Sequence, residues 1–373
     1  MIIGVPKEIK PDERRVSVLP HLVKSMVELG HKVIVQEGAG IGSGVEDSSY
    51  VREGALIANC IENVYEESDI IIKVKEPLDS ELNLIKDSQI IFTYFHFAGD
   101  INLTKKFIKT NAIGIAYETV ESAKGDLPLL TPMSEIAGRM SIQNGAKYLE
   151  GTFGGKGKLL SGVPGVEPAT VTIIGAGVVG LNAAKLAAGL GAQVNVLDIN
   201  MDRLRYLDDI MPANVITHHS NTYNLSKLLP GTDLLVGGVL VPGSAAPKIV
   251  SKKMLKTMKS GSVLVDVAVD QGGCIETTKP TTHHNPIYEV DGIIHYCVAN
   301  MPGAVPKTST TSLTNNTSSY ILDLLNEDFK SGTIKNNSIK SGINIYKGKI
   351  THRGLADSFS LEYSELSSLL SDS

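Results

Sequence analysis

The chain has 373 residues, of which 42% are hydrophobic and 20% are charged, so it can bury more than one core and is not disordered. Its length favours two domains. A formal net charge of −5, no tryptophan and few other aromatic side chains argue against a nucleic-acid partner.

The three cysteines, Cys60, Cys274 and Cys297, form no Cys-x-x-Cys pair. This spacing argues against a disulfide framework or a cysteine zinc site and favours a reducing compartment. The apolar start of the chain ends at Pro6, which is too short for a signal peptide, and no apolar run approaches the ~18 residues of a membrane span. We therefore expect a cytoplasmic protein with no membrane partner.

The first 125 residues alternate short β-branched runs with helical patterns, which is typical of a parallel sheet covered by helices on both faces. Strands are expected at 2–5, 32–36, 69–74, 89–93 and 112–116. Helices are expected at 16–29, 82–86 and 102–109.

The second half of the chain shows the same alternation after a glycine-rich stretch at 151–165. Strands are expected at 169–174, 193–197, 233–236, 262–265 and 292–295, and helices at 181–190 and 319–329. The fold class predicted is therefore α/β, with two doubly wound, Rossmann-type parallel sheets.

The turn Gly175-Ala176-Gly177-Val178-Val179-Gly180 predicts a dinucleotide site, because it follows a strand and opens a helix. Gly175 permits the tight turn, Gly177 lets backbone N–H groups approach a pyrophosphate, and Gly180 allows close helix packing. Asp198, at the end of the next strand, would bind the adenosine ribose and repel a 2′-phosphate. This favours NAD over NADP, although two nearby arginines weaken the preference. The alternative is a tight turn that binds no ligand.

Three cationic or titratable residues follow predicted strands: Arg15, Lys75 and His96. Ligands of open α/β sheets collect at the carboxyl ends of the strands. Each residue alone could be a solvated charge or a half-buried side chain, but the three together favour a small anionic substrate. Asp270, shortly after the strand at 262–265, could face a nicotinamide or could cap a turn.

Six segments resemble the alanine dehydrogenase/transhydrogenase α-subunit family, and the likeness covers essentially the whole chain. They are GVPKEIKPDERRVSVLP (4–20), KVKEP (73–77), YFHFA (94–98), GAGVVG (175–180), DVAVDQGG (266–273) and NMPGAVPKTST (300–310). The resemblance implies an NAD-dependent enzyme, a homohexamer, that oxidatively deaminates L-alanine to pyruvate and ammonium and catalyses the reverse reaction. The transhydrogenase subunit is the poorer match, because we see no membrane-directed extension.

The resemblance also assigns roles to residues. It places Arg15 on the substrate carboxylate, Lys75 on the substrate carbonyl or amino-bearing carbon, His96 as acid/base and Asp270 as the second catalytic group. For NAD it implies, beside Gly175, Gly177 and Gly180, the residues Ser134, Val178, Asp198, Arg203, Ser220, Val239, Leu240, Val267, Ala268, Val269, Asp270, Lys279, Val298, Ala299, Asn300 and Met301. It implies no metal here, because an acidic residue and a histidine often found in the family correspond to Asp323 and Glu327.

The implied organisation is a discontinuous substrate domain of residues 1–128 and 307–373, an NAD-binding domain of residues 129–306, and an active cleft between them. Hydride would leave the alanine Cα for nicotinamide, and water would attack the resulting iminium with help from Asp270. A catalytically silent NAD-binding protein is the other class considered; it would be expected to lack one of the four catalytic or substrate-binding residues, and none is replaced.

Overall fold

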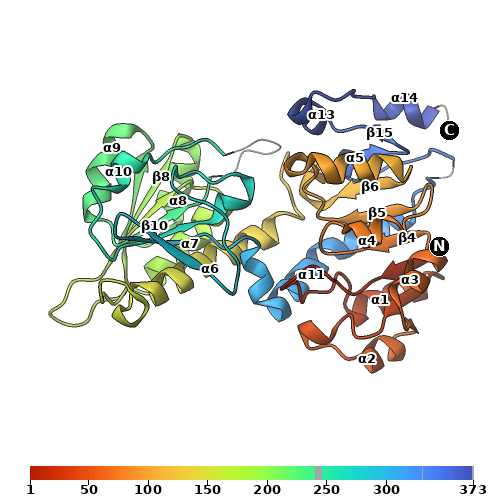
Figure 1. Cartoon of the computed structure of the whole chain (residues 1–373), viewed down its shortest axis with the longest axis horizontal. Helices are drawn as coiled ribbons and strands as arrows, with labels where there is room; N and C mark the ends of the chain where they lie inside the picture. Colours follow the sequence, from red (N-terminus) through yellow and green to blue (C-terminus); the bar gives the residue numbers. More distant parts are fainter. Residues whose placement is uncertain (240–245, 330, 372–373) are drawn as a thin grey trace. The chain divides into compact units, whose positions relative to one another are not determined.

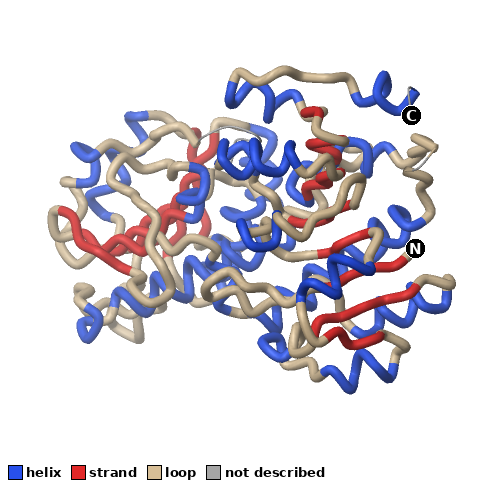
Figure 2. Tube along the Cα trace, turned by 45° about the vertical axis from the view of Figure 1, so that its right-hand side comes forward, coloured by secondary structure: helices blue, strands red, loops and turns tan. Residues whose placement is uncertain are grey.

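The computed structural model describes residues 1–239, 246–329 and 331–371. The chain forms two compact units, of which unit 1 comprises Met1–Met133 with Gly303–Ser373 and unit 2 comprises Ser134–Pro302. In each unit the strands form a sheet with helices packed beside it (Figures 1 and 2).

The sheet of unit 1 has the strand order β15-β14-β6-β5-β4-β1-β2-β3. Its strands are β1 (Ile2–Val5), β2 (Lys32–Gln36), β3 (Leu56–Ala58), β4 (Ile70–Ile72), β5 (Ile90–Thr93), β6 (Ile113–Ala116), β14 (Ile343–Tyr346) and β15 (Lys349–Ile350). Strands β1 to β6 pair in parallel, whereas β14 is antiparallel to both of its neighbours. The all-apolar sequences of the central strands suit a sheet that helices cover on both faces.

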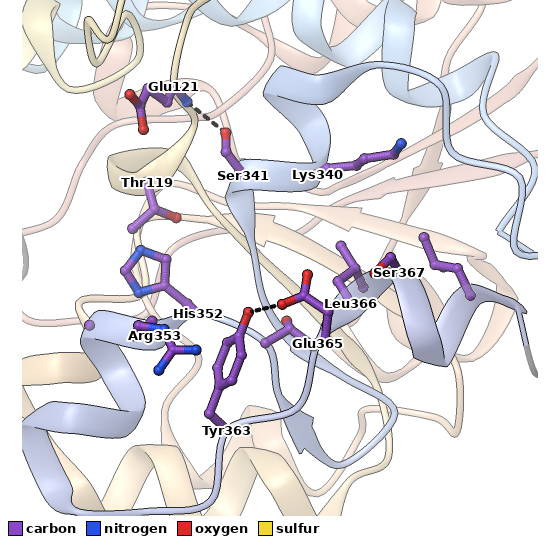
Figure 3. Close-up of a pocket in the computed structure, with 13 residues that line it drawn as sticks. Thr119, Glu121, Lys340, Ser341, His352, Arg353, Tyr363, Glu365, Leu366 and Ser367 are labelled. Atoms are coloured by element: carbon purple, nitrogen blue, oxygen red, sulfur yellow. Dashed lines mark hydrogen bonds between the residues drawn. The ribbon is translucent and has the colours of Figure 1, made fainter.

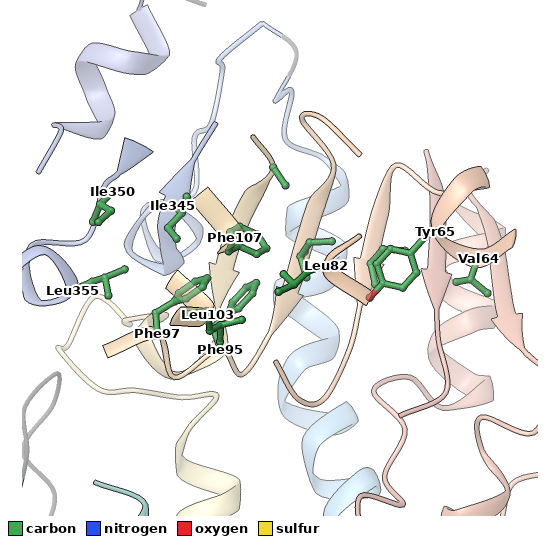
Figure 4. Close-up of a cluster of buried hydrophobic side chains, with 14 of the residues drawn as sticks. Val64, Tyr65, Leu82, Phe95, Phe97, Leu103, Phe107, Ile345, Ile350 and Leu355 are labelled. Atoms are coloured by element: carbon green, nitrogen blue, oxygen red, sulfur yellow. The ribbon is translucent and has the colours of Figure 1, made fainter. Parts of the chain in front are cut away.

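Helices flank this sheet and close its core. They are α1 (Pro20–Glu28), α2 (Asp47–Arg52), α3 (Ile61–Glu67), α4 (Asp79–Leu82), α5 (Ile101–Lys109), α11 (Pro306–Leu325), α12 (Asn337–Gly342), α13 (Arg353–Phe359) and α14 (Leu366–Ser371), while α6 (Thr131–Leu149) begins in unit 1 and continues into unit 2. One core cluster contains Tyr65, Leu82, Phe95, Phe97 and Phe107 (Figure 4).

The sheet of unit 2 has the strand order β12-β13-β11-β10-β7-β8-β9. Its strands are β7 (Thr170–Ile174), β8 (Gln193–Asp198), β9 (Val215–His219), β10 (Leu234–Gly237), β11 (Val263–Asp266), β12 (Ile287–Val290) and β13 (Ile293–Tyr296), and its helices include α7 (Val178–Gly189), α8 (Met201–Ile210), α9 (Thr222–Leu228) and α10 (Lys252–Leu255). Because β7 lies between β8 and β10, the strand order reverses at its carboxyl end, where ligands of such sheets bind.

The predicted fold class is confirmed, because both sheets are mainly parallel and doubly wound. Among the described strands, antiparallel pairs occur only towards one end of each sheet, where β12 pairs with β13 and β14 pairs with both β6 and β15. The predicted domain boundaries at 128/129 and 306/307 stay predictions.

Three predicted helices have different bounds in the structure. The helix expected at 16–29 begins only at Pro20, and the one expected at 82–86 is instead Asp79–Leu82. The last predicted helix corresponds to α11, which starts at Pro306 rather than at 319, because its hydroxyl-rich first half is buried. Thr317 Oγ1 donates to the Leu313 carbonyl, which satisfies a buried hydroxyl that the sequence pattern presents as polar.

Candidate active site

Unit 1 carries the three predicted substrate-site residues beyond three strands that neighbour one another in the sheet. Arg15, Lys75 and His96 follow β1, β4 and β5 respectively, and these strands are parallel. Their carboxyl ends therefore lie at one edge. The Arg15 and Lys75 side chains are buried, whereas the His96 side chain is 44% exposed.

A buried carboxylate fixes the Arg15 guanidinium. Arg15 Nε donates to Glu13 Oε1 at 2.7 Å and Nη2 donates to Glu13 Oε2 at 2.5 Å, which is a bidentate pair. Arg15 Nη1 donates to Met133 Sδ at 3.1 Å. Burial lowers the pKa of a guanidinium, but the hydrogen bonds and charge of Glu13 outweigh burial and raise the pKa of Arg15. Arg15 is thus a permanent cation held in a fixed plane.

Two buried phenylalanines present His96 outward. The Phe95 and Phe97 rings stack with centroids 4.1 Å apart and pack on Phe107 (Figure 4). The His96 side chain between them is partly exposed. His96 has φ 51° and ψ 37°, a left-handed conformation that costs a non-glycine residue about 1–2 kcal/mol. Backbone strain of this size is typical of functional positions. The Tyr94 ring stacks parallel to the imidazole at a centroid distance of 6.0 Å.

Electrostatics keep the His96 imidazole neutral. Loss of hydration and the positive charges of Lys75, Lys10 and Arg15 lower the pKa of His96 below its ordinary value. The ordinary pKa of an imidazole is ~6.5, so this lowered pKa leaves His96 uncharged at neutral pH. A neutral imidazole in a cationic environment is a proton acceptor, and the same environment attracts an anion.

Lys75 is anchored through its backbone. Its N–H donates to Glu8 Oε1 at 3.3 Å, and its carbonyl accepts a hydrogen bond from Thr93 Oγ1 at 2.9 Å. Glu8 Oε1 also accepts the Val74 N–H at 2.7 Å, while Glu8 Oε2 pairs with the fully buried Lys73 at 3.3 Å. Burial raises the pKa of Glu8, and Lys73 opposes that effect.

The sequence analysis missed three glutamates in this region: Glu8, Glu13 and Glu118. The first two stand in the opening segment that carries the family resemblance, so that segment could have indicated them. Glu118 follows β6, and no local pattern distinguishes it. Its carboxylate accepts the N–H of His96 at 2.6 Å and that of Phe95 at 3.3 Å.

In unit 2, the predicted glycine turn has the geometry of a phosphate cradle. Gly175 has φ 100°, and a Cβ on it would lie 2.8 Å from the Gly238 carbonyl oxygen. A Cβ on Gly180 would lie 1.8 Å from the Gly175 oxygen, so only glycine lets the helix approach the strand. Gly177 faces open space and precedes the first turn of α7. An accessible backbone at a helix N-terminus fits a pyrophosphate.

Asp198, Arg203 and Ser220 gather beside this turn. Asp198 Oδ2 accepts the Ala176 N–H at 2.6 Å, and Arg203 Nη2 donates to the Ala176 carbonyl at 2.9 Å. The Ser220 N–H donates to the Asp198 carbonyl at 2.8 Å. Each carboxylate oxygen keeps a second lone pair, so Asp198 can still accept ribose hydroxyls.

A second group of predicted residues also comes together in unit 2. The Asn300 N–H donates to Asp270 Oδ2 at 3.2 Å, which joins the segments 267–270 and 298–301. Asp266 builds the first of these segments by accepting the N–H groups of Ala268 and Cys274 at 3.0 Å each. Val239 lies beside the glycine turn, because a Cβ added to Gly175 would lie 3.3 Å from Val239 Cγ2.

The remaining predicted cofactor residues are less closely tied to the turn. The Lys279 ammonium lies over the Tyr288 ring, 4.8 Å from its centroid. Ser134 lies one helical turn before Gly138 on α6. The Gly138 backbone packs so closely on the start of α7 that an added Cβ would clash with the Val179 carbonyl. Leu240 lies outside the described residues.

Two further features of unit 1 do not involve the predicted residues. A pocket of about 440 Å³ near the C-terminus is lined by residues that include Glu121, Lys340, His352, Arg353 and Tyr363 (Figure 3). Separately, Asp323 and Glu327 hydrogen-bond to the segment 335–336. Within the described ranges, no three His, Cys, Asp or Glu side chains gather as a metal site would require.

The glycine turn, the reversal of strand order at β7 and the acidic residue at the end of β8 define a nucleotide-binding α/β protein. The family models for the N-terminal and C-terminal domains of alanine dehydrogenase/PNT match residues 4–137 and 141–353. The chain belongs to the alanine dehydrogenase/PNT family, whose members are oxidoreductases.

Similar proteins cover the full chain. An alanine dehydrogenase of Methanococcus maripaludis is 53% identical over 373 residues, which is 100% of both chains, and one of Geobacillus stearothermophilus is 48% identical over 99% of this chain and 100% of its own. A solved L-alanine dehydrogenase has 46% identity and a TM-score of 0.92 over 96% of this chain and 99% of its own. A transhydrogenase from Sinorhizobium meliloti shares the fold, with 22% identity and a TM-score of 0.79 over 95% of this chain and 99% of its own. Among the described residues, no helix has the length and apolar character needed to cross a bilayer.

Proposed function

We propose that this chain is an L-alanine dehydrogenase, which oxidises L-alanine to pyruvate and ammonium with NAD and catalyses the reverse reaction. The observation that carries the proposal is the alignment of Arg15, Lys75 and His96 beyond three adjacent strands, in a protein 53% identical to a named alanine dehydrogenase. Unit 1 is the proposed substrate domain and unit 2 the proposed NAD domain.

Arg15 and Lys75 bind the substrate in this proposal. The guanidinium that Glu13 fixes in plane matches a carboxylate, which accepts planar hydrogen bonds. Lys75 is a point charge on a flexible stem, so it follows the oxygen that develops at Cα as alanine becomes pyruvate. Together they select a short α-amino or α-keto acid.

His96 and Asp270 handle protons and water. NAD, when bound, accepts the hydride that leaves the alanine Cα. Water then adds to the iminium carbon as neutral His96 accepts its proton, and the same imidazolium returns a proton to the leaving amine. Lys75 stabilises the oxygen of the carbinolamine, and Asp270 stabilises the positive iminium or orients the water. As the C–N bond breaks and ammonia departs, the neutral imidazole accepts the carbinolamine hydroxyl proton, which leaves pyruvate.

NAD would be held by the glycine turn, by Asp198 and by the other residues predicted for the cofactor. The cradle at Gly177 and the remaining acceptor capacity of Asp198 support this assignment. A homohexamer in the cytoplasm is part of the same proposal and rests on the family resemblance. Light scattering of the purified protein should give a mass six times that of one chain.

The direct test is NADH formation by the purified protein at alkaline pH. We expect activity with L-alanine and NAD, little with D-alanine, and much less with NADP. Activity of the purified chain without any membrane partner excludes a transhydrogenase-type subunit. Absence of NADH formation with L-alanine, in a sample that binds NAD, would contradict the proposal.

A further inference from the structure

Each of the three groups proposed to handle the substrate has its backbone N–H bonded to a different glutamate. The pairs are Arg15 N–H to Glu13 Oε1 at 3.0 Å, Lys75 N–H to Glu8 Oε1 at 3.3 Å, and His96 N–H to Glu118 Oε1 at 2.6 Å. Glu8 and Glu13 come from the loop after β1, whereas Glu118 comes from the turn after β6. The same device therefore recurs on separate parts of the fold.

We propose that Glu8, Glu13 and Glu118 are positioning residues for the alanine oxidation proposed above, on which this inference rests. Each holds one substrate-handling residue through its backbone and places a carboxylate behind it. We refer to the three as the glutamate layer.

The burial of the glutamate layer is the first argument. The side chain of Glu13 is 0% exposed, that of Glu8 is 3% exposed and that of Glu118 is 14% exposed. Buried carboxylates are costly unless they are paired and hydrogen-bonded. A neutral amide could accept the same N–H groups, so two buried acids and one half-buried acid indicate that charge is used there.

The charge balance is the second argument. Arg15, Lys75 and Lys73 lie beside the layer, and their positive charges would repel one another in a buried site. Carboxylates beside them offset that repulsion. The layer thus allows several cations to be held close to the proposed substrate site at a lower cost in stability.

The constraint on geometry is the third argument. Glu118 accepts the N–H groups of Phe95 and His96, so it fixes the backbone that leads into His96, a residue in the left-handed conformation that L-residues avoid. Glu13 accepts both the N–H and the guanidinium of Arg15. Misplacement of a catalytic group by about 1 Å can cost about 10²-fold in rate. The loss of a glutamate should therefore appear in catalysis.

The test uses isosteric substitutions in the full chain: Glu8→Gln, Glu13→Gln and Glu118→Gln. Glu81→Gln is the matched control, because Glu81 is also buried and pairs with Lys73, yet its carboxylate caps Leu78 rather than a substrate-handling residue. Melting temperature and NAD binding report folding. Steady-state kinetics with L-alanine and NAD report positioning.

We expect Glu13→Gln to raise the KM for L-alanine and Glu118→Gln to lower kcat, each by about tenfold or more, with the KM for NAD unchanged. Glu8→Gln should affect both alanine parameters, and Glu81→Gln should lose stability but keep activity within about threefold. If the wild type is active and the three glutamate-layer variants keep as much activity as Glu81→Gln, the inference is overturned while the proposed function stands. A wild type that is inactive with L-alanine contradicts the proposed function, and the inference falls with it. Glu118→Gln decides the outcome if the more buried variants fail to fold.

Discussion

The backbone N–H of His96 donates to Glu118 Oε1 at 2.6 Å, and the imidazole Nδ1 lies 4.0 Å from the same oxygen. One carboxylate thus meets both the main chain and the ring of the proposed acid/base. Burial raises the pKa of Glu118 to about 7, against the opposing effect of these backbone hydrogen bonds and of Lys75. The Glu118 carboxyl beside His96 therefore changes its charge near neutral pH.

This raised pKa predicts a pH-dependent cost in stability. Between pH 4.5 and 7 the unfolded chain has Glu118 ionised while the folded chain keeps it protonated, so its stabilising contribution is lost as pH rises through 7. The whole effect is about 3 kcal/mol. The fall in melting temperature from pH 5 to pH 8.5 should be smaller in Glu118→Gln than in wild type. Equal falls in the two proteins would contradict the raised pKa.

A second prediction concerns the charges around His96. Lys75, Lys10 and Arg15 lower the pKa of the imidazole, and Glu118 faces it with a carboxylate. Lys10→Gln removes one positive charge, so the pKa of His96 should rise towards its ordinary value. The pKa of His96 is lowered to about 3, so the acidic limb of kcat/KM for L-alanine, measured from pH 3 to 9, should move to higher pH. The exposed Lys24→Gln is the control. If neither variant shifts the pH of the acidic limb, His96 is not the group that titrates in it.

Two glycines of the same turn should respond differently to alanine. In Gly180→Ala the new Cβ would lie 1.8 Å from the Gly175 oxygen, so the backbone must shift and unit 2 should lose roughly 2 kcal/mol or more. In Gly177→Ala the methyl group meets nothing within 4 Å, so the melting temperature should be kept. NAD binding by Gly177→Ala should still weaken about tenfold, because the methyl occupies the phosphate approach. Normal NAD affinity in a folded Gly177→Ala would place the pyrophosphate elsewhere.

Cofactor choice should depend on Asp198. Its carboxylate lies at the end of β8 and accepts the Ala176 N–H at 2.6 Å. Asp198→Gly removes the repulsion of a 2′-phosphate and the ribose acceptor together. The ratio of kcat/KM for NAD to that for NADP should fall by about tenfold or more. Lys253→Gln, at an exposed position of α10, is the control, and a ratio that Asp198→Gly leaves unchanged would refute the assignment.

The sequence predicted those features that rest on local patterns. The strands and the glycine turn follow from β-branched runs and from spacing within a few residues, which is why β7 and α7 were expected within about three residues of their bounds. The antiparallel strand β14 was not expected, because it pairs with β6 from more than 200 residues away.

The glutamate layer was missed for the same reason. Glu8 and the backbone of Lys75 are 67 residues apart in sequence, and Glu118 and His96 are 22 apart. An isolated glutamate in a sequence is ordinarily a solvated surface residue. Only the sheet order, which brings the carboxyl ends of distant strands together, gives Glu8 and Glu118 these partners, whereas Glu13 pairs with Arg15 two residues along the chain.

The central claim is that His96 moves protons during oxidation of L-alanine, and turnover of His96→Asn tests it most directly. Asparagine tolerates the left-handed backbone at this position, and the His96 side chain is 44% exposed, so the variant should keep its melting temperature and its NAD binding. An amide cannot shuttle protons, so kcat at saturating L-alanine and NAD should fall by about 10²–10⁴-fold. A folded, NAD-binding His96→Asn enzyme with a kcat close to that of wild type would contradict the account.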